Sequence, residues 1–169
     1  MIEMKVMGIA LDVRTNSPIV VLNDLDKRKA LPIWIGSAEA SAIIRCIEGL
    51  AVVRPMTHDL LNNVITQTGY KIDKVEINDV EKETYYATIF ISKGDEVLEI
   101  DSRPSDAIAV AMRADVPIYV TANVLMNGSV STDSAKDEEE AQEFKDFIQN
   151  IKPSDFEKLM KGKHEESDQ

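Results

Sequence analysis

The chain has 169 residues, a formal net charge of −11 and 44% hydrophobic residues, with a single cysteine. This length suits one domain with its own hydrophobic core, followed by a tail. The negative charge argues against a protein that coats nucleic acid electrostatically, and the lone cysteine excludes an internal disulfide. No apolar run approaches the roughly 20 residues that a membrane-spanning helix needs, and no signal peptide is recognised. We therefore expect a cytoplasmic protein with no membrane partner.

The first third of the chain predicts three strands joined by short turns. Residues 5–13 alternate between polar and apolar, residues 19–22 read as a buried strand, and residues 31–35 form a third strand. Short connections between them favour an antiparallel meander. We expect Trp34, in the third strand, to pack in the core rather than to serve as a ligand platform.

Two helices are predicted next. Ser37 is the expected N-cap of a helix over residues 38–48. Thr57 is the expected N-cap of a second helix, over residues 59–68. The apolar residues of this second helix recur at helical spacing, which predicts that they face inward. They are Leu60, Leu61, Val64 and Ile65.

A second group of strands follows, and it ends in a strand–helix–strand unit. Strands are predicted at 71–77, 84–91, 96–101 and 118–120, and a helix at 105–113. The unit formed by the last three of these segments is compact enough for a right-handed parallel crossover. Together the elements predict an α+β fold with a mixed, largely antiparallel sheet.

The character of the chain changes after the main domain, which we assign to residues 1–126. Residues 127–136 are polar and contain glycine, which predicts a mobile loop. Residues 137–162 are predicted to form an acidic helical extension with an apolar stripe, and residues 163–169 are expected to be disordered. We expect the extension to pack on its own domain or on a neighbouring subunit; a partner-binding tail is the alternative.

The familiar catalytic signatures are absent from the sequence. It has no nucleophile-elbow motif, no phosphate-binding glycine loop, no Cys-x-x-Cys pair and no His-Glu-x-x-His. The two histidines, His58 and His164, are too few for a multi-histidine zinc site within one subunit. A catalytic metal would therefore be held mainly by oxygen, which points to Mg²⁺, Mn²⁺ or Ca²⁺.

Oxygen ligands are available around the predicted strand–helix junction. Glu99 and Asp101 are two positions apart on one strand and so share a face, and Asp106 lies at the start of the next helix. Carboxylates that hold one or two Mg²⁺ ions can activate water against a phosphodiester. Arg103 or Arg54 would then neutralise the developing negative charge.

The same residues also admit a structural interpretation. Ser105 and Asp106 can cap the helix, while Arg103 forms an ion pair with Asp101 or Asp59. Helix caps are commoner than metal sites, so spacing alone favours this alternative.

His58 is a candidate general base, with Asp59 as the carboxylate that would orient it. Adjacent residues on a helix point about 100° apart, which places Asp59 poorly for that task. The alternative is that His58 is a partly exposed residue of the first helical turn.

Tyr85 and Tyr86 are adjacent on a predicted strand. One ring can stack on a nucleobase. Strand alternation sends the two rings to opposite faces, so we expect the other ring to be in the core.

Four ordered motifs resemble the bifunctional nuclease domain family, over roughly residues 3–125. They are Leu31-Pro32-Ile33-Trp34-Ile35-Gly36 with Glu39-Ala40, Arg54-Pro55 with Thr57-His58-Asp59-Leu60, residues 101–109, and Val116-Pro117-Ile118. The resemblance implies an α+β domain that assembles into homo-oligomers, as a dimer or a higher form. It also implies cleavage of both DNA and RNA, as reported for plant members.

The resemblance carries a set of signature positions onto this chain: Arg54, His58, Asp59, Asp101, Arg103, Ser105 and Asp106. Our leading hypothesis is a metal-dependent nuclease with little sequence preference, acting on nucleic acid. Its catalytic candidates are His58, Asp59, Asp101 and Asp106; its substrate-binding candidates are Arg54, Arg103 and Ser105. The candidate ligands for Mg²⁺ or Mn²⁺ are Glu99, Asp101 and Asp106. The alternatives are a non-catalytic oligomeric scaffold and a regulatory protein that binds anions or nucleotides.

Overall fold

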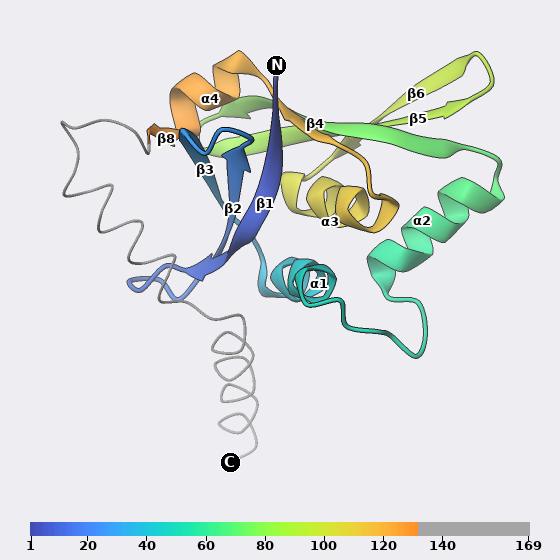
Figure 1. The fold of residues 1–169 in the computed structure, drawn as a ribbon, viewed down its shortest axis with the longest axis horizontal. Helices are drawn as coiled ribbons and strands as arrows, with labels where there is room; N and C mark the ends of the chain where they lie inside the picture. The colour runs from blue at the N-terminus through green and yellow to red at the C-terminus, as the bar shows by residue number, and fades with distance from the viewer. Residues whose placement is uncertain (132–169) are drawn as a thin grey trace.

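A computed structural model describes residues 1–131, in which helices pack on a single mixed sheet (Figure 1). The strands are β1 (Ile2–Leu11), β2 (Pro18–Asp24), β3 (Lys29–Trp34), β4 (Lys71–Glu81), β5 (Thr84–Lys93), β6 (Glu96–Ser102), β7 (Ile118–Val120) and β8 (Val130–Ser131). The helices are α1 (Ser37–Ile47), α2 (Thr57–Gln67), α3 (Pro104–Ala114) and α4 (Ala122–Gly128). The spatial order of the strands is β6-β5-β4-β7-β1-β2-β3-β8.

The predicted meander is confirmed: β1, β2 and β3 pair antiparallel in chain order. The short strand β7 then joins the two halves of the sheet, because it pairs antiparallel with β1 and parallel with β4. All other pairings in the described sheet are antiparallel. The predicted α+β class with a mixed, largely antiparallel sheet is therefore confirmed.

The strand–helix–strand unit β6–α3–β7 is also present, and its two strands are parallel. Since β6 runs antiparallel to β5 and β5 antiparallel to β4, β6 has the same direction as β4 and hence as β7. The unit spans β5 and β4, which lie between its two strands. As a result, α3 crosses beneath the middle of the sheet rather than beside its edge.

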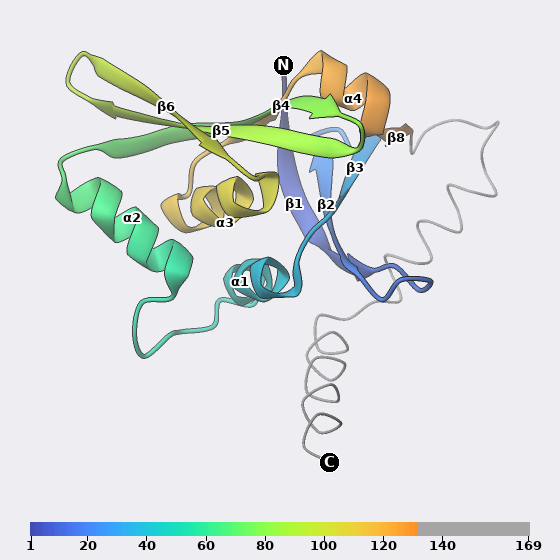
Figure 2. The same cartoon turned by 180° about the vertical axis from the view of Figure 1, so that it is seen from behind.

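Helix α3 is the centre of the packing. It contacts α1 and α2 on one side and β4 and β5 on the other, as both views of the ribbon show (Figures 1 and 2). Its buried residues include Ala107, Ala109 and Ala111, whose small side chains allow neighbouring elements to approach closely. Ile108 and Val110 fill the core between them. The position of α3 therefore fixes where its first turn meets the other helices.

The first two helices begin earlier than the sequence predicts, α1 by one position and α2 by two. Helix α1 begins at Ser37 with Gly36 as its N-cap, and α2 begins at Thr57 with Met56 as its N-cap. Neither N-cap is Ser37 or Thr57. At α2 the carboxylate of Asp59 accepts the backbone N–H of Met56 at 2.8 Å, so a side chain within the helix satisfies the donor at the boundary.

The prediction that the apolar residues of α2 face inward is wrong for three of the four. Ile65 is buried, but Leu60, Leu61 and Val64 are exposed. The reason is that α2 turns His58 and Ile65 toward the core, where it packs on α3. A single helix can bury only one stripe against its neighbour, so its remaining apolar side chains lie on the surface.

The prediction that Trp34 packs in the core is wrong, since 54% of its surface is exposed. In β3, Leu31 and Ile33 point into the core, and strand alternation therefore turns Pro32 and Trp34 to the opposite face. The alternation expected for the adjacent tyrosines is seen: Tyr85 packs partly buried against the core and Tyr86 is exposed.

The mobile loop predicted from residue 127 is not seen where the structure describes the chain. Asn127 and Gly128 are the last residues of α4, and residues 130–131 pair with β3 as β8. The rest of that loop, the helical extension at 137–162 and the tail at 163–169 lie outside the described residues. Within residues 1–131, no helix combines the length and apolar character needed to cross a membrane. The cytoplasmic location stays a prediction.

Candidate functional site

The first turns of three helices supply a chain of polar contacts. His58 in α2 places Nε2 at 2.9 Å from Oδ1 of Asp106 in α3. The other oxygen of Asp106 accepts from Nε of Arg103 at 2.8 Å, and Nη2 of Arg103 donates to Oε1 of Glu39 in α1 at 2.7 Å. We call His58, Asp106, Arg103 and Glu39 the four-residue network. It brings residues from α1, α2 and α3 into one cluster.

The contact between His58 and Asp106 determines where the imidazole proton lies. An ionised carboxylate can only accept hydrogen bonds, so Nε2 of His58 carries the hydrogen that Asp106 accepts. In the neutral ring, Nδ1 then keeps its lone pair and can accept a proton. The arrangement is therefore that of a base oriented by a carboxylate.

The charges of the network stabilise one another. Burial raises the pKa of Asp106, but hydrogen bonds from Arg103 and then His58 outweigh burial, and the pKa lies below its ordinary value. Hydrogen bonds to Asp106 and then Glu39 raise the pKa of Arg103. Glu39 and Asp106 also lie in the first turns of α1 and α3, where the positive end of a helix favours a carboxylate.

Solvent reaches this network unevenly. The side chain of Arg103 is 65% exposed and that of Asp106 28%, whereas His58 is only 10% exposed. Arg103 is therefore the member that an incoming anion meets first. A phosphate at this guanidinium competes with Glu39, while His58 lies deeper, behind Asp106.

Asp59 belongs to a separate ion pair. Its Oδ1 accepts from Nε of Arg113 at 2.8 Å, and its Oδ2 accepts from the N–H of Met56. Arg113 also donates to the backbone carbonyls of Ala109 and Ala42. Burial raises the pKa of Asp59, but the hydrogen bonds from Met56 and Arg113 outweigh burial, so the pKa lies below its ordinary value. With both oxygens engaged, Asp59 ties α2 to α3, and its role in proton transfer stays a prediction.

Two expected substrate-binding residues lie outside the network. Arg54 is exposed in the connection between α1 and α2 and makes no hydrogen bond or ion pair within residues 1–131. Ser105 is 6% exposed beneath the first turn of α3, which leaves its hydroxyl little access to a substrate phosphate. The N-cap of α3 is Arg103 without a side-chain cap, so the alternative that Ser105 and Asp106 cap this helix is wrong. Arg103 likewise pairs with Asp106 and Glu39, not with Asp101 or Asp59.

The expected metal ligands are not gathered into one cluster. Glu99 and Asp101 lie on the same face of β6, which pairs with β5 in unbroken register, and both are exposed. Asp106 has both oxygens occupied by His58 and Arg103. Within residues 1–131, no three side chains of His, Cys, Asp or Glu come close enough to hold a metal together. A three-carboxylate site therefore does not fit this arrangement.

Sequence reasoning missed Glu39 and Arg113 as members of these clusters. Glu39 is 64 positions from Arg103, and Arg113 is 54 positions from Asp59, so no local spacing links either pair. One weak signal existed for Glu39. A side chain at position 36 would collide with its carboxylate, so Gly36 leaves room for it.

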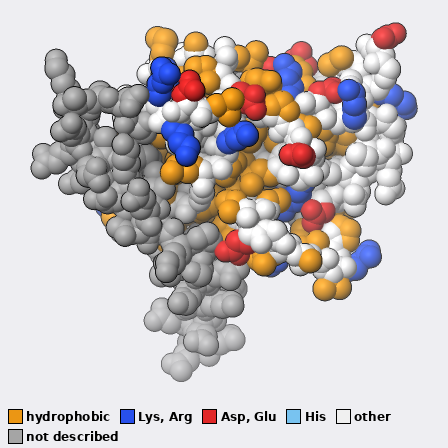
Figure 3. Space-filling view, viewed as in Figure 1, with side chains coloured by type: hydrophobic (Ala, Val, Ile, Leu, Met, Phe, Trp, Pro, Cys, Tyr) orange, Lys and Arg blue, Asp and Glu red, His pale blue; other side chains and the backbone are white. Residues whose placement is uncertain are grey.

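The surface around these elements carries both signs of charge. On the face shown in Figure 3, Lys and Arg side chains are interspersed with Asp and Glu among hydrophobic groups. That face has no broad basic patch of the kind that binds a polyanion by charge alone. Any nucleic-acid contact there has to rest on specific groups.

Comparisons with known proteins agree with the motifs of the sequence. The model of the bifunctional nuclease domain matches residues 20–133. An uncharacterised protein of Mycobacterium tuberculosis is 35% identical over 162 residues, covering 91% of this chain and 97% of that protein. Bifunctional nuclease 2 of Oryza sativa subsp. japonica is 35% identical over 107 residues, which is 61% of this chain and 33% of the plant protein.

Bifunctional nuclease 1 of Arabidopsis thaliana is 27% identical over 113 residues, covering 60% of this chain and 35% of that protein. The match with the plant proteins thus spans about a third of their length, whereas the match with the mycobacterial protein is nearly complete. The family model covers more than half of the present chain and includes every member of the four-residue network. On these grounds, the chain belongs to the bifunctional nuclease domain family.

Proposed function

We propose that this protein is a nuclease that hydrolyses phosphodiester bonds of DNA and RNA with little sequence preference. Membership of the bifunctional nuclease domain family supports the reaction class. The observation that carries the proposal is the contact of His58 with Asp106 and of Asp106 with Arg103. These three side chains supply a base, a carboxylate that orients it and a cation for phosphate, which are the groups that phosphodiester hydrolysis needs.

In this proposal His58 accepts at Nδ1 a proton from the water that attacks phosphorus. As the new P–O bond forms, the bond from phosphorus to the leaving oxygen breaks, and that oxygen takes up a proton from solvent. Asp106 is the positioning residue, because it holds Nε2 and stabilises the imidazolium that forms. Arg103 exchanges Glu39 for a substrate phosphate and stabilises the negative charge that develops on it. The exposed Arg54 is a second candidate phosphate contact.

Divalent-cation dependence is part of the proposal and rests on two carboxylates. Glu99 and Asp101 share one exposed face of β6 and make no ion pair within the described residues. Mg²⁺ commonly binds through one or two carboxylates together with substrate phosphates, which this pair can satisfy. When bound, Mg²⁺ or Mn²⁺ would supply charge neutralisation at the phosphate.

The test is hydrolysis of single-stranded DNA and RNA by the full chain with Mg²⁺ or Mn²⁺. We expect His58→Gln and Asp106→Asn to lower kcat about 100-fold or more, as the loss of an acid–base group does. Arg28→Met is the surface control, because within residues 1–131 the exposed Arg28 side chain pairs with Asp26 alone, and it should retain wild-type rates. Equal residual activity in all variants would indicate a contaminant and overturn the proposed site.

A second candidate function has its own observation. The four-residue network ties α1, α2 and α3 together, and His58 is nearly buried, as expected for a non-catalytic oligomeric scaffold. In that case Arg103→Ala should lower the melting temperature or dissociate the assembly, while the wild-type protein hydrolyses no nucleic acid. Full stability and assembly of Arg103→Ala would count against the scaffold. Binding of mononucleotides, measured calorimetrically, tests the related possibility of a regulatory anion-binding protein.

A further inference from the structure

A cavity of about 860 Å³ lies where the end of β3 meets the β4–β5 turn, and it shares no residue with the four-residue network. We call it the Trp34 cavity. Its walls include two aromatic rings, two cations and two carboxylates: Trp34, Tyr85, Arg14, Lys82, Asp12 and Glu83. Its volume falls in the range of about 300–1,000 Å³ that is usual for small-ligand sites.

Trp34 is held in place although it is exposed. Its Nε1 donates to Oδ2 of Asp12 at 3.1 Å, while 54% of the residue remains accessible. Asp12 is itself fixed by the backbone N–H of Arg14 at 2.9 Å, a hydrogen bond that lowers the pKa of Asp12 and keeps it an ionised acceptor. The hydrogen bond takes up the edge of the indole, so its apolar ring surface is fixed and open to a ligand.

The aromatic wall formed by Tyr85 is equally constrained. Tyr85 packs against the core, and its hydroxyl lies so close to Gly128 that a Cβ there would collide with it. Gly128 therefore gives this ring its space at the end of α4. Two fixed aromatic rings in one cavity favour a flat, aromatic ligand.

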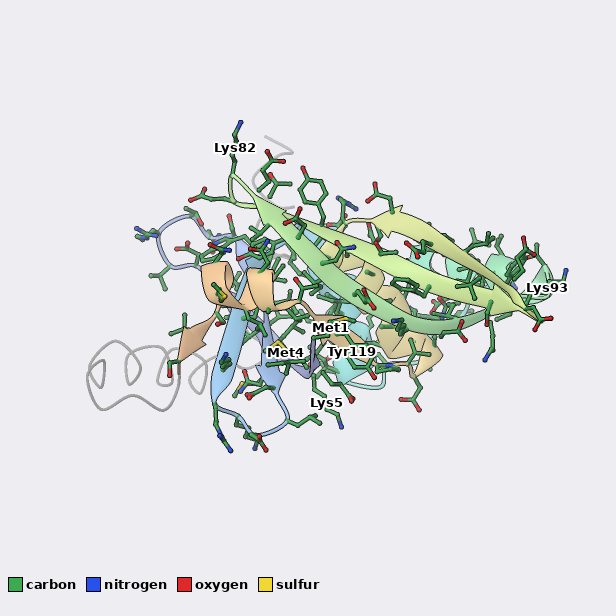
Figure 4. All side chains as sticks on the ribbon, turned by 90° about the horizontal axis from the view of Figure 1, so that it is seen from above. Met1, Met4, Lys5, Lys82, Lys93 and Tyr119 are labelled. Atoms are coloured by element: carbon green, nitrogen blue, oxygen red, sulfur yellow. The ribbon has the colours of Figure 1, made fainter. Side chains whose placement is uncertain are left out.

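The charges of the Trp34 cavity indicate how such a ligand is held. Arg14 is 85% exposed, and Lys82 projects outward from the β4–β5 turn (Figure 4). Asp12 and Glu83 offset these two cations, so the four groups carry no net charge. Attraction of the phosphate backbone therefore contributes little, and stacking on an aromatic ring has to supply most of the binding energy.

We propose that the Trp34 cavity binds an unpaired base of single-stranded DNA or RNA, with Trp34 as the stacking surface. This inference rests on the proposed nuclease function, because it names how that substrate is held. It also explains how a chain with a net charge of −11 can engage a polyanion. Duplex DNA keeps its bases stacked inside the helix and cannot use this site.

The Trp34 cavity connects to the four-residue network through the backbone. Glu39 follows Trp34 by five positions across the β3–α1 connection. Two residues after Tyr85, Ala87 pairs with Ser102, the residue before Arg103. These backbone connections join the cavity to the segments that carry Glu39 and Arg103, where the proposed function places a phosphate.

Trp34 is the only tryptophan of the chain, so its intrinsic fluorescence reports directly on this cavity. Short oligothymidylate is titrated into the full chain in EDTA, with the oligonucleotide checked for integrity afterwards. We expect saturable quenching by the single strand and at least fivefold weaker binding of a duplex of equal length. With two phosphates neutralised at most, the logarithm of the binding constant should fall by less than about 1.5 per decade of salt.

Variants are compared by anisotropy of a labelled oligothymidylate. Trp34→Ala should raise Kd about five- to 100-fold, the usual effect of removing one stacked base contact, and Trp34→Phe should lie between it and wild type. Leu25→Ala is the control, since Leu25 is an exposed apolar residue outside the cavity, and its Kd should stay within about twofold. Circular dichroism of each variant checks folding.

The outcomes separate this inference from the proposed function. Unchanged Kd and KM in folded Trp34→Ala would overturn the stacking site, while hydrolysis by wild type would uphold the nuclease. Saturable quenching of wild type, together with an at least fivefold higher Kd of Trp34→Ala by anisotropy but no hydrolysis with any cation, would uphold the site and overturn the nuclease. Absence of any binding by wild type would overturn the site.

Discussion

His58 and Asp106 are 48 positions apart in the chain, yet Nε2 of the histidine lies 2.9 Å from Oδ1 of the aspartate. The contact exists because α2 packs on α3 and His58 is one of the buried residues of α2. An imidazole that is nearly buried and held by a carboxylate has a fixed orientation. That relationship underlies both the proposed chemistry and the stability of the helical layer.

Asp106→Asn should destabilise the protein and flatten the dependence of stability on pH. The pKa of Asp106 is below 3.8 when folded and has its ordinary value of 3.8 when unfolded, so its ionised form stabilises the fold above 3.8. This contribution disappears as pH falls from 3.8 through the lower folded pKa. We expect Asp106→Asn to lower the free energy of unfolding at pH 7 by about 1–3 kcal/mol, which is the contribution of hydrogen bonds to charged groups.

Urea unfolding over the range from neutral to acid pH measures this effect. Below pH 3.8, the free energy of unfolding of the wild type should fall more steeply with decreasing pH than that of Asp106→Asn. Asp59 is intact in both proteins, and its lowered pKa contributes the same slope to each. Parallel curves would contradict the role given to Asp106.

Arg113→Met should be among the most destabilising single substitutions in the helical layer. The Arg113 side chain is 9% exposed and binds Asp59 and two backbone carbonyls. Its loss leaves the partly buried carboxylate of Asp59 without its cation. Breaking a buried pair in this way lowers the free energy of unfolding by about 3–5 kcal/mol. Urea denaturation at pH 7 measures the loss, with the exposed Arg28→Met expected within about 0.5 kcal/mol of wild type. A loss as small as that of the control would mean that the ion pair contributes little.

Removal of divalent cations should abolish hydrolysis, and Mg²⁺ or Mn²⁺ should restore it. The exposed pair Glu99 and Asp101 is the proposed source of ligands, so the double variant Glu99→Gln/Asp101→Asn should need about tenfold more cation for half-maximal rate. Glu48→Gln, an exposed carboxylate after the end of α1, is the control and should need no more than wild type. Full activity in EDTA would show that the reaction needs no divalent cation.

The exposed apolar residues of α2 should mediate assembly into the homo-oligomer that the family resemblance implies. Leu60 is 56% and Val64 52% exposed, one helical turn apart. We expect the wild-type chain to be a dimer or higher form and Leu60→Glu/Val64→Glu to be monomeric, since a charge buried in an interface without a partner is costly. Light scattering after size-exclusion chromatography gives the masses. Met126→Glu changes an exposed apolar residue of α4 and should assemble normally; equal masses for all three proteins would refute this interface.

The local elements of this fold could be predicted from the sequence. Residue patterns located the strands β1 to β7, including the opposite faces of Tyr85 and Tyr86, and helical spacing located α1, α2 and α3; β8 and α4 were not predicted. The motifs that carry the resemblance also identified the family, because their order and residue types survive in a linear string. These are properties of neighbouring residues, and short-range sterics and periodic burial determine them.

The partners of the charged side chains were decided by the tertiary structure. The structural alternative pairs Arg103 with Asp101 or Asp59, but Arg103 pairs with Glu39 and Asp106, and Asp59 pairs with Arg113 instead. Trp34 was expected in the core but is exposed, and it shares a cavity with Tyr85. The physical reason is the same in each case. Which groups meet depends on how α3 docks beneath the sheet, and that docking is set by the packing of many buried side chains at once rather than by spacing along the chain.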